Sequence, residues 1–138
     1  MSLNSVSEID ATTPRTLRDR YAIVGVGETS YMRGSGRTTR ALATWAIRNA
    51  MADAGLTAAD IDGMLSYSGG DSTPSPLIAG DLGIRLNFYM DCFGGGSSTE
   101  ALIGIATGVI AAGMCRTVAI FRSMNGYSQV RIGGTGAR

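Results

Sequence analysis

A glycine-rich turn between a strand-like stretch and a helix-like stretch most constrains how this chain folds. Residues 93–100 read Phe-Gly-Gly-Gly-Ser-Ser-Thr-Glu. The preceding residues 86–92 are bulky and aromatic, as in a partly buried strand. Residues 101–114 carry no charge and many small side chains, which predicts a helix buried on nearly all sides. The turn is therefore expected to join a strand to a buried helix at one edge of a sheet.

The residues of this turn suit the binding of a carbonyl oxygen. Glycine has no Cβ, so a ligand can come close to the backbone N–H groups. Ser97 and Glu100 have the spacing of a capping box, which predicts that the helix begins there. The unpaired N–H groups of the first helical turn would then point into the crevice beyond the strand and stabilise a developing negative charge. A tight turn without chemistry remains the alternative at this point.

The whole chain alternates strand patterns with helix patterns. A helix is expected to begin at Thr38 or Thr39 and to end before Gly55, and residues 57–60 have a second capping-box spacing. The order predicts an α/β fold with a largely parallel sheet. Residues 1–20 form a polar N-terminal arm, and residues 21–138 form the domain. The expected strands are 21–27, 64–67, 86–92 and 117–122, and the expected helices are 38–54, 77–82 and 101–114.

Composition excludes several functions. The 138 residues can bury one ordinary core. Twelve basic and eleven acidic residues give a net charge of +1, which offers no electrostatic case for binding nucleic acid or an anionic membrane. The N-terminal arm has no apolar core of a signal peptide, and residues 101–114 fall short of the roughly 18 needed to span a bilayer. A cytoplasmic protein is therefore expected.

The two cysteines are expected to be reduced. Cys92 lies at a strand end and Cys115 beyond a helix of about 20 Å, too far apart for a disulfide. A nucleophilic thiol would belong in the first helical turn, but Cys92 precedes Ser97 by five residues. A small buried apolar role is favoured for Cys92, and a catalytic role stays open.

One segment only partly matches the glycine-rich motif that binds dinucleotides. The spacing Gly25-x-Gly27-x-x-Ser30 lacks the third glycine of that motif. In addition, the next helix begins about a dozen residues later instead of inside the motif. The sequence therefore argues against binding of NAD or FAD.

Four segments together resemble the first half of the thiolase superfamily. They are residues 23–29, the helix 42–54 with Asp-Ala-Gly-Leu at 53–56, Asp-Ile-Asp-Gly at 60–63, and the glycine turn before Ala101. The likeness covers about residues 20–130 and is nearest to the lipid-transfer, sterol-carrier type. It implies a thiolase-like fold of two βαβαβαββ halves, of which this chain would form one incomplete half. It also implies a homodimer that acts on acyl-CoA thioesters, without a metal or a further cofactor.

The resemblance also bears on the nucleophile. Counting back from residues 112–114, the position of the acyl-accepting cysteine in thiolases falls on Gly96. The sequence contains no histidine, and the family's histidine and second cysteine belong to the C-terminal half. The Gly-Gly-Ser-Ser form resembles thiolase-like aldolases that cleave a β-hydroxyacyl-CoA without a cysteine nucleophile. Those enzymes work with a small OB-fold, zinc-ribbon partner protein.

The sequence thus predicts an acyl-CoA enzyme region that breaks or forms a carbon–carbon bond, as an aldolase or an acyltransferase. The 138 residues alone are expected to be incomplete and inactive. A thiolase that uses Cys92 and a non-catalytic lipid- or acyl-CoA-binding protein are the alternatives. The candidate catalytic residues are Cys92 and Ser97, and the candidate substrate-binding residues are Gly94, Gly95, Gly96, Ser98, Arg122, Ser123 and Met124.

Overall fold

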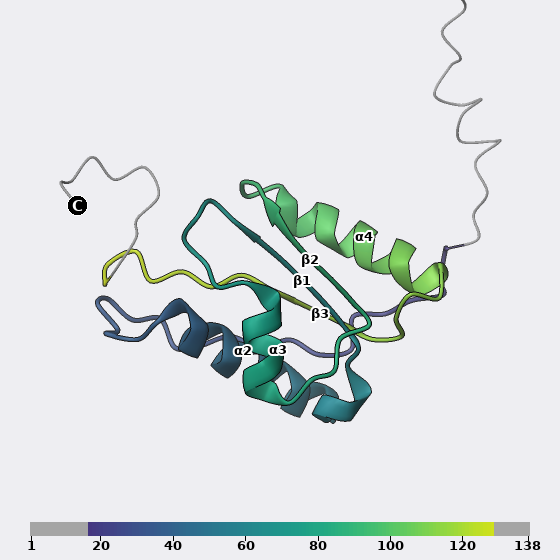
Figure 1. Cartoon of the computed structure of the whole chain (residues 1–138), viewed down its shortest axis with the longest axis horizontal. Helices are drawn as coiled ribbons and strands as arrows, with labels where there is room; N and C mark the ends of the chain where they lie inside the picture. The colour runs from purple at the N-terminus through teal and green to yellow at the C-terminus, as the bar shows by residue number, and fades with distance from the viewer. Residues whose placement is uncertain (1–16, 129–138) are drawn as a thin grey trace, which may run out of the picture.

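A computed structural model describes residues 17–128 as a parallel three-stranded sheet with helices on both faces (Figure 1). The strand order is β2-β1-β3. The predicted α/β class and parallel sheet are confirmed. Most of the predicted N-terminal arm, residues 1–16, and residues 129–138 lie outside the described residues. The elements are α2 (Thr39–Ala54), the short 3-10 helix η1 (Ala58–Asp60), β1 (Gly63–Ser68), α3 (Ser75–Leu82), β2 (Phe88–Phe93), α4 (Ser98–Ala111) and β3 (Val118–Phe121).

The central strand β1 holds the two layers of the core together. Its Leu65 is paired in register with Met90 of β2 and Ile120 of β3. Met64 is fully buried against α2 and α3, and Leu65 is fully buried against α4. Because both faces of β1 are covered, the strand is apolar on both sides, as is typical of parallel sheets.

Helix α2 begins and ends where its sequence predicts. The Thr38 hydroxyl accepts a hydrogen bond from the Ala41 N–H at 3.1 Å. Gly55 closes the helix in the left-handed region, with φ of 66°. The capping-box spacing of residues 57–60 is also confirmed, because the Asp60 carboxylate accepts hydrogen bonds from the N–H and the hydroxyl of Thr57.

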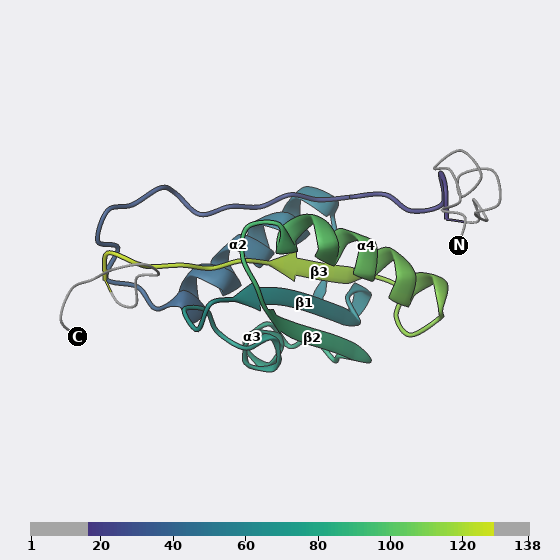
Figure 2. The same ribbon diagram turned by 90° about the horizontal axis from the view of Figure 1, so that it is seen from above.

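The prediction of a strand at residues 21–27 is wrong. This segment is extended, but its backbone lies against α2 instead of pairing with a strand, and Figure 2 shows it outside the sheet on the β3 side. The Val26 N–H donates to Asp53 Oδ2 at 2.9 Å. A Cβ on Gly25 would lie 2.5 Å from the Ala50 carbonyl oxygen, and a Cβ on Gly27 would overlap the Ala50 nitrogen. The two glycines therefore serve close packing on a helix, which accounts for their spacing without a dinucleotide.

Two expectations about α4 are also wrong. Among the described residues, only Leu102 and Ala106 of this helix are buried, and Ile103 is exposed, so α4 is covered on one side. Ser97 does not cap the helix, because its backbone is already helical and its side chain makes no capping hydrogen bond. The helix instead begins with a hydrogen bond of 3.0 Å from the Ser98 N–H to the Gly95 carbonyl.

Candidate functional site

The carboxyl ends of the parallel strands bring two of the predicted site regions to one edge of the sheet. The glycine turn follows β2, and Arg122 follows β3. Because β1 lies between these strands, the two regions are separated by roughly 10 Å, about two strand spacings. The Gly94 N–H donates to the Ser68 carbonyl at 3.2 Å, which fixes the turn to the end of β1.

The glycine turn presents an open backbone at the start of α4. None of its three glycines has a positive φ, so none is needed for a left-handed conformation. A Cβ on Gly95 or Gly96 would meet no described atom within 4 Å, whereas a Cβ on Gly94 would overlap the Ser98 hydroxyl. The first N–H groups of α4 have no acceptor within the helix. Gly95 and Gly96 thus leave room for an oxygen atom to reach this helix N-terminus.

The side chain of Cys92 belongs to the apolar cluster under α4. It is half-buried and packs against the cluster of Leu65 and Leu102 beneath α4. Cys115 is buried near Gly63 at the opposite edge of the sheet, and burial, with a smaller contribution from the Asp62 charge, raises the pKa of its thiol. Both cysteines are free, as the sequence predicts.

A cavity of about 550 Å³ adjoins the exit of β3 and brings together Arg122, Ser123 and Met124. These are the three residues that the sequence predicts to line a crevice beyond the last strand. Leu42 and Ala46 of α2 contribute apolar surface to the same cavity. The glycine turn does not line it, so the structure separates the predicted substrate-binding residues into two groups. The remaining lining residues lie in segments 27–35 and 125–128, together with Asp71.

A buried ion pair orients Arg122 at this cavity. Its Nη2 lies 2.6 Å from Asp71 Oδ2, and its guanidinium stacks over the Tyr67 ring at 4.8 Å. Burial alone would raise the pKa of Asp71, but hydrogen bonds from Arg122 and the Gly69 N–H outweigh burial and lower it. Arg122 Nε is buried and has no acceptor among the described residues. The Ser123 hydroxyl is 3.1 Å from that of Ser72 and so faces the same loop.

The structure adds Asp91 to the residues that shape this edge. Its carboxylate accepts hydrogen bonds of 2.5 Å from the Ser66 and Ser75 hydroxyls and one of 2.9 Å from the Ser75 N–H. Asp91 thereby ties β1 and the start of α3 to β2 just before the glycine turn. The one sequence signal was a lone carboxylate inside an otherwise bulky strand. Asp71 and Tyr67 were likewise missed, because each acts through Arg122, far along the chain.

Between residues 17 and 128, no group of three His, Cys, Asp or Glu side chains lies close enough to hold a metal ion. No helix in the same part of the chain is long and apolar enough to cross a membrane.

Two solved structures share this fold. The "Ltp2-ChsH2(DUF35) aldolase" superposes with a TM-score of 0.74 at 33% sequence identity, over 83% of this chain and 30% of that chain. A monomeric SCP2-thiolase-like protein type 1 from Mycobacterium smegmatis superposes with a TM-score of 0.57 at 28% identity, over 71% of this chain and 22% of that chain. The described residues therefore have a thiolase-like α/β fold. No protein-family model matches the chain.

Curated relatives are similar over most of this chain. A 17-hydroxy-3-oxo-4-pregnene-20-carboxyl-CoA lyase from Mycobacterium tuberculosis is 34% identical over 118 residues, which is 85% of this chain. A steroid side-chain-cleaving aldolase from Thermomonospora curvata is 34% identical over 113 residues, which is 81% of this chain. This chain spans about 30% of the length of each relative. The relatives are named as enzymes. The SCP2-thiolase-like structure agrees with the predicted resemblance to thiolase-like proteins.

Proposed function

We propose that the whole protein containing these residues is an acyl-CoA carbon–carbon lyase of the retro-aldolase type. The similarity to a named lyase and a named aldolase carries this proposal. The match to the lyase covers 118 of the 138 residues. The few residues outside the match lie toward the ends of the chain, so the match includes the glycine turn in the middle. The proposed substrate is a β-hydroxyacyl-CoA, by analogy with the CoA ester for which the Mycobacterium tuberculosis lyase is named.

The open glycine turn suits the chemistry of such a cleavage. The β-hydroxyl loses its proton and becomes a carbonyl, while the bond between the α and β carbons breaks. The electron pair moves onto the α carbon and the thioester oxygen as an enolate, which is then protonated on carbon. Backbone N–H groups at Gly96 and in the first turn of α4, apart from that of Ser98, which already donates to the Gly95 carbonyl, would stabilise that oxygen as it gains charge. No acyl group is transferred, so no cysteine is needed.

The placement of Cys92 bears on the second candidate, a thiolase-type acyltransferase. That reaction needs a thiolate facing the thioester carbon. The Cys92 side chain packs beneath α4 instead, against the cluster of Leu65 and Leu102. The retro-aldolase reaction is therefore favoured over acyl transfer.

The first experiment is a turnover assay of the whole protein with a β-hydroxyacyl-CoA. We expect a shorter acyl-CoA and a ketone or aldehyde, detected by chromatography with mass spectrometry. Cys92→Ser should retain most of the turnover, since no acyl-cysteine forms. Trapping of an acyl group on Cys92 would establish the acyltransferase instead. Saturable acyl-CoA binding without any cleavage would favour a non-catalytic binding protein.

A glycine substitution tests the turn directly. Gly96→Ala places a methyl group in the open space before α4, and we expect kcat/KM to fall about ten-fold, roughly 1.4 kcal/mol. The melting temperature should change little, because Gly96 has no positive φ. Gly80→Ala on α3 is the control, since its Cβ also meets no atom within 4 Å but lies outside the turn. Unchanged kinetics for Gly96→Ala would remove the turn from the active site.

We also propose a homodimer formed through the edge strand β2. This strand pairs on one side only among the described residues, and it exposes Tyr89 and Phe93. An unpaired apolar edge favours pairing with a second copy. Light scattering on the whole protein tests this, and a stable monomer at micromolar concentration would contradict it. The aldolase neighbour is named for two components, which supports a partner protein. That this partner has an OB-fold and a zinc ribbon is a further proposal.

A further inference from the structure

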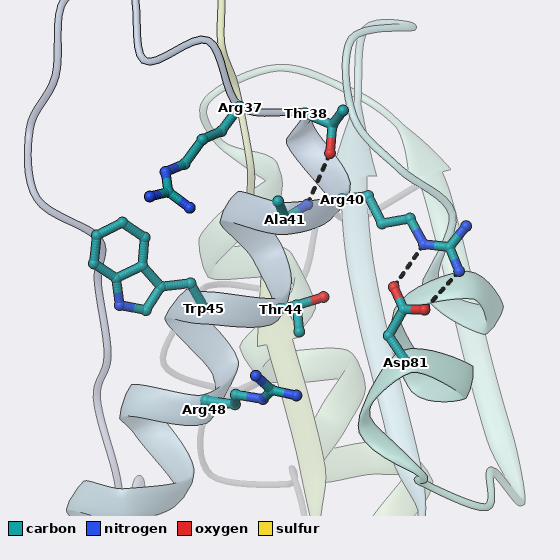
Figure 3. A pocket seen from close by; sticks show the side chains of 8 residues that line it. All are labelled: Arg37, Thr38, Arg40, Ala41, Thr44, Trp45, Arg48 and Asp81. Carbon is teal, nitrogen blue, oxygen red and sulfur yellow. Dashed lines mark hydrogen bonds and ion pairs between the residues drawn. The ribbon is translucent and has the colours of Figure 1, made fainter.

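A second cavity, of about 490 Å³, lies between α2 and α3 and is separate from the proposed active site. Figure 3 shows the small side chains of Ala41 and Thr44 in its middle, with longer side chains around them. The surrounding side chains are Arg37, Arg40, Trp45, Arg48 and Asp81.

The cavity carries an excess of positive charge. Asp81 is its only carboxylate, and Arg40 holds both oxygens of Asp81 at 2.6 Å. The guanidinium groups of Arg37 and Arg48 make no hydrogen bond or salt bridge to any described residue, although Arg37 lies over the Trp45 ring at 5.4 Å. Because the whole sequence has a net charge of only +1, this excess is local.

Two neutral hydroxyls add hydrogen-bonding capacity. Thr44 Oγ1 is buried and has no partner in the described part of the chain. The Thr38 hydroxyl accepts from the Ala41 N–H and keeps its own proton free to donate. A buried hydroxyl without a partner is uncommon, and a ligand oxygen would satisfy it once the surrounding side chains move apart.

We propose that this cavity binds the phosphoryl groups of a phosphate ester or a diphosphate. Guanidinium groups bind phosphate oxygens in pairs through charge-assisted hydrogen bonds, and Arg48 and Arg37 are available for this. The Thr44 hydroxyl donates to a third oxygen, while the Trp45 ring borders the site. Arg40, already neutralised by Asp81, forms the wall facing α3.

The ligand has two possible sources that share this chemistry. Coenzyme A carries phosphate and diphosphate groups, so the cavity can hold the nucleotide end of the proposed substrate. The cavity begins at the N-terminus of α2, where the Thr39 hydroxyl lies 2.8 Å from that of Thr73 in the loop after β1. That loop follows the carboxyl end of β1, at the same edge as the glycine turn. The other source is a separate phosphate compound.

Calorimetric titration of the whole protein with sodium pyrophosphate tests the proposal without any need for turnover. We expect saturable binding that weakens as salt is added. Arg48→Gln should weaken it ten-fold or more, roughly 1.4 kcal/mol, and Thr44→Val should weaken it several-fold. Arg85→Gln is the matched control, because Arg85 is exposed and outside the cavity. Trp45 emission, identified by comparison with Trp45→Phe, should change in parallel.

Titration with CoA separates the two sources. If Arg48→Gln weakens CoA and pyrophosphate equally, the cavity holds the nucleotide of the substrate. If only pyrophosphate binding weakens, the ligand is a separate phosphate compound. No saturable binding up to about 10 mM pyrophosphate, or equal affinities for Arg48→Gln and Arg85→Gln, overturns the proposal.

Discussion

Two arginine–aspartate pairs in this protein have the same length and different surroundings. Arg122–Asp71, at the exit of β3, and Arg40–Asp81, between α2 and α3, both have N···O distances of 2.6 Å. The side chains of the first pair are 17% and 1% exposed, whereas those of the second are 46% and 32% exposed. Water screens the second pair and can replace either partner. Burial, and not distance, therefore decides which pair the fold depends on.

Breaking the buried pair should have the largest effect. Asp71→Ala leaves the Arg122 guanidinium buried without its carboxylate, and we expect the free energy of unfolding to fall by about 3 kcal/mol. Denaturant titration of the whole protein measures this loss. In the double variant Asp71→Ala with Arg122→Met, an apolar side chain replaces the stranded charge, and much of the stability should return. If the double variant were no more stable than Asp71→Ala, the cost would not lie in the buried charge.

Lowering the pH should also weaken the buried pair, with a smaller loss of stability than the substitution causes. The folded state lowers the pKa of Asp71 below its ordinary value of about 3.9, despite the opposing effect of burial. The resulting stability is present above that ordinary value and is lost as the pH falls through the lower folded pKa. Between about pH 4 and pH 2 the melting temperature of wild type should therefore fall more steeply than that of Asp71→Ala. Parallel curves would contradict this assignment.

Breaking the exposed pair should have the smallest effect. Asp81→Asn removes a bidentate ion pair that lies in solvent, so the melting temperature should stay within measurement error of wild type. It should also tighten pyrophosphate binding, because it removes the only carboxylate of the cavity. A loss of stability as large as that of Asp71→Ala would show that burial does not distinguish the two pairs.

Local spacing predicted several elements because each depends on near neighbours. Thr38 caps α2 through Ala41, and Gly55 ends the same helix, so both contacts stay within one or two turns of chain. The glycine run predicted a strand-to-helix turn, and β2 and α4 flank it within three residues of the expected bounds. The parallel sheet followed from the order of strands and helices alone.

Long-range packing decided what the local pattern could not. Residues 21–27 have a strand composition, but Gly25 and Gly27 let their backbone lie on α2 instead. Ser97 and Glu100 have capping-box spacing, but the turn that begins at Gly95 already places Ser97 in a helical conformation. In both cases the local sequence preference is worth little energy. Packing on α2 overrides it at residues 21–27, and the path of the adjoining backbone overrides it at Ser97.

Patterns in the amino-acid sequence were enough to predict the α/β class, the position of the glycine turn and the residues that leave β3. The folded chain was needed to show that Arg122 pairs with Asp71, that Asp91 joins β1 to α3, and that Cys92 packs beneath α4. Strand order and layer packing bring these groups together across long stretches of chain. The energy of each of these contacts depends on how deeply its groups are buried. The spacing of residues along the chain does not reveal that burial.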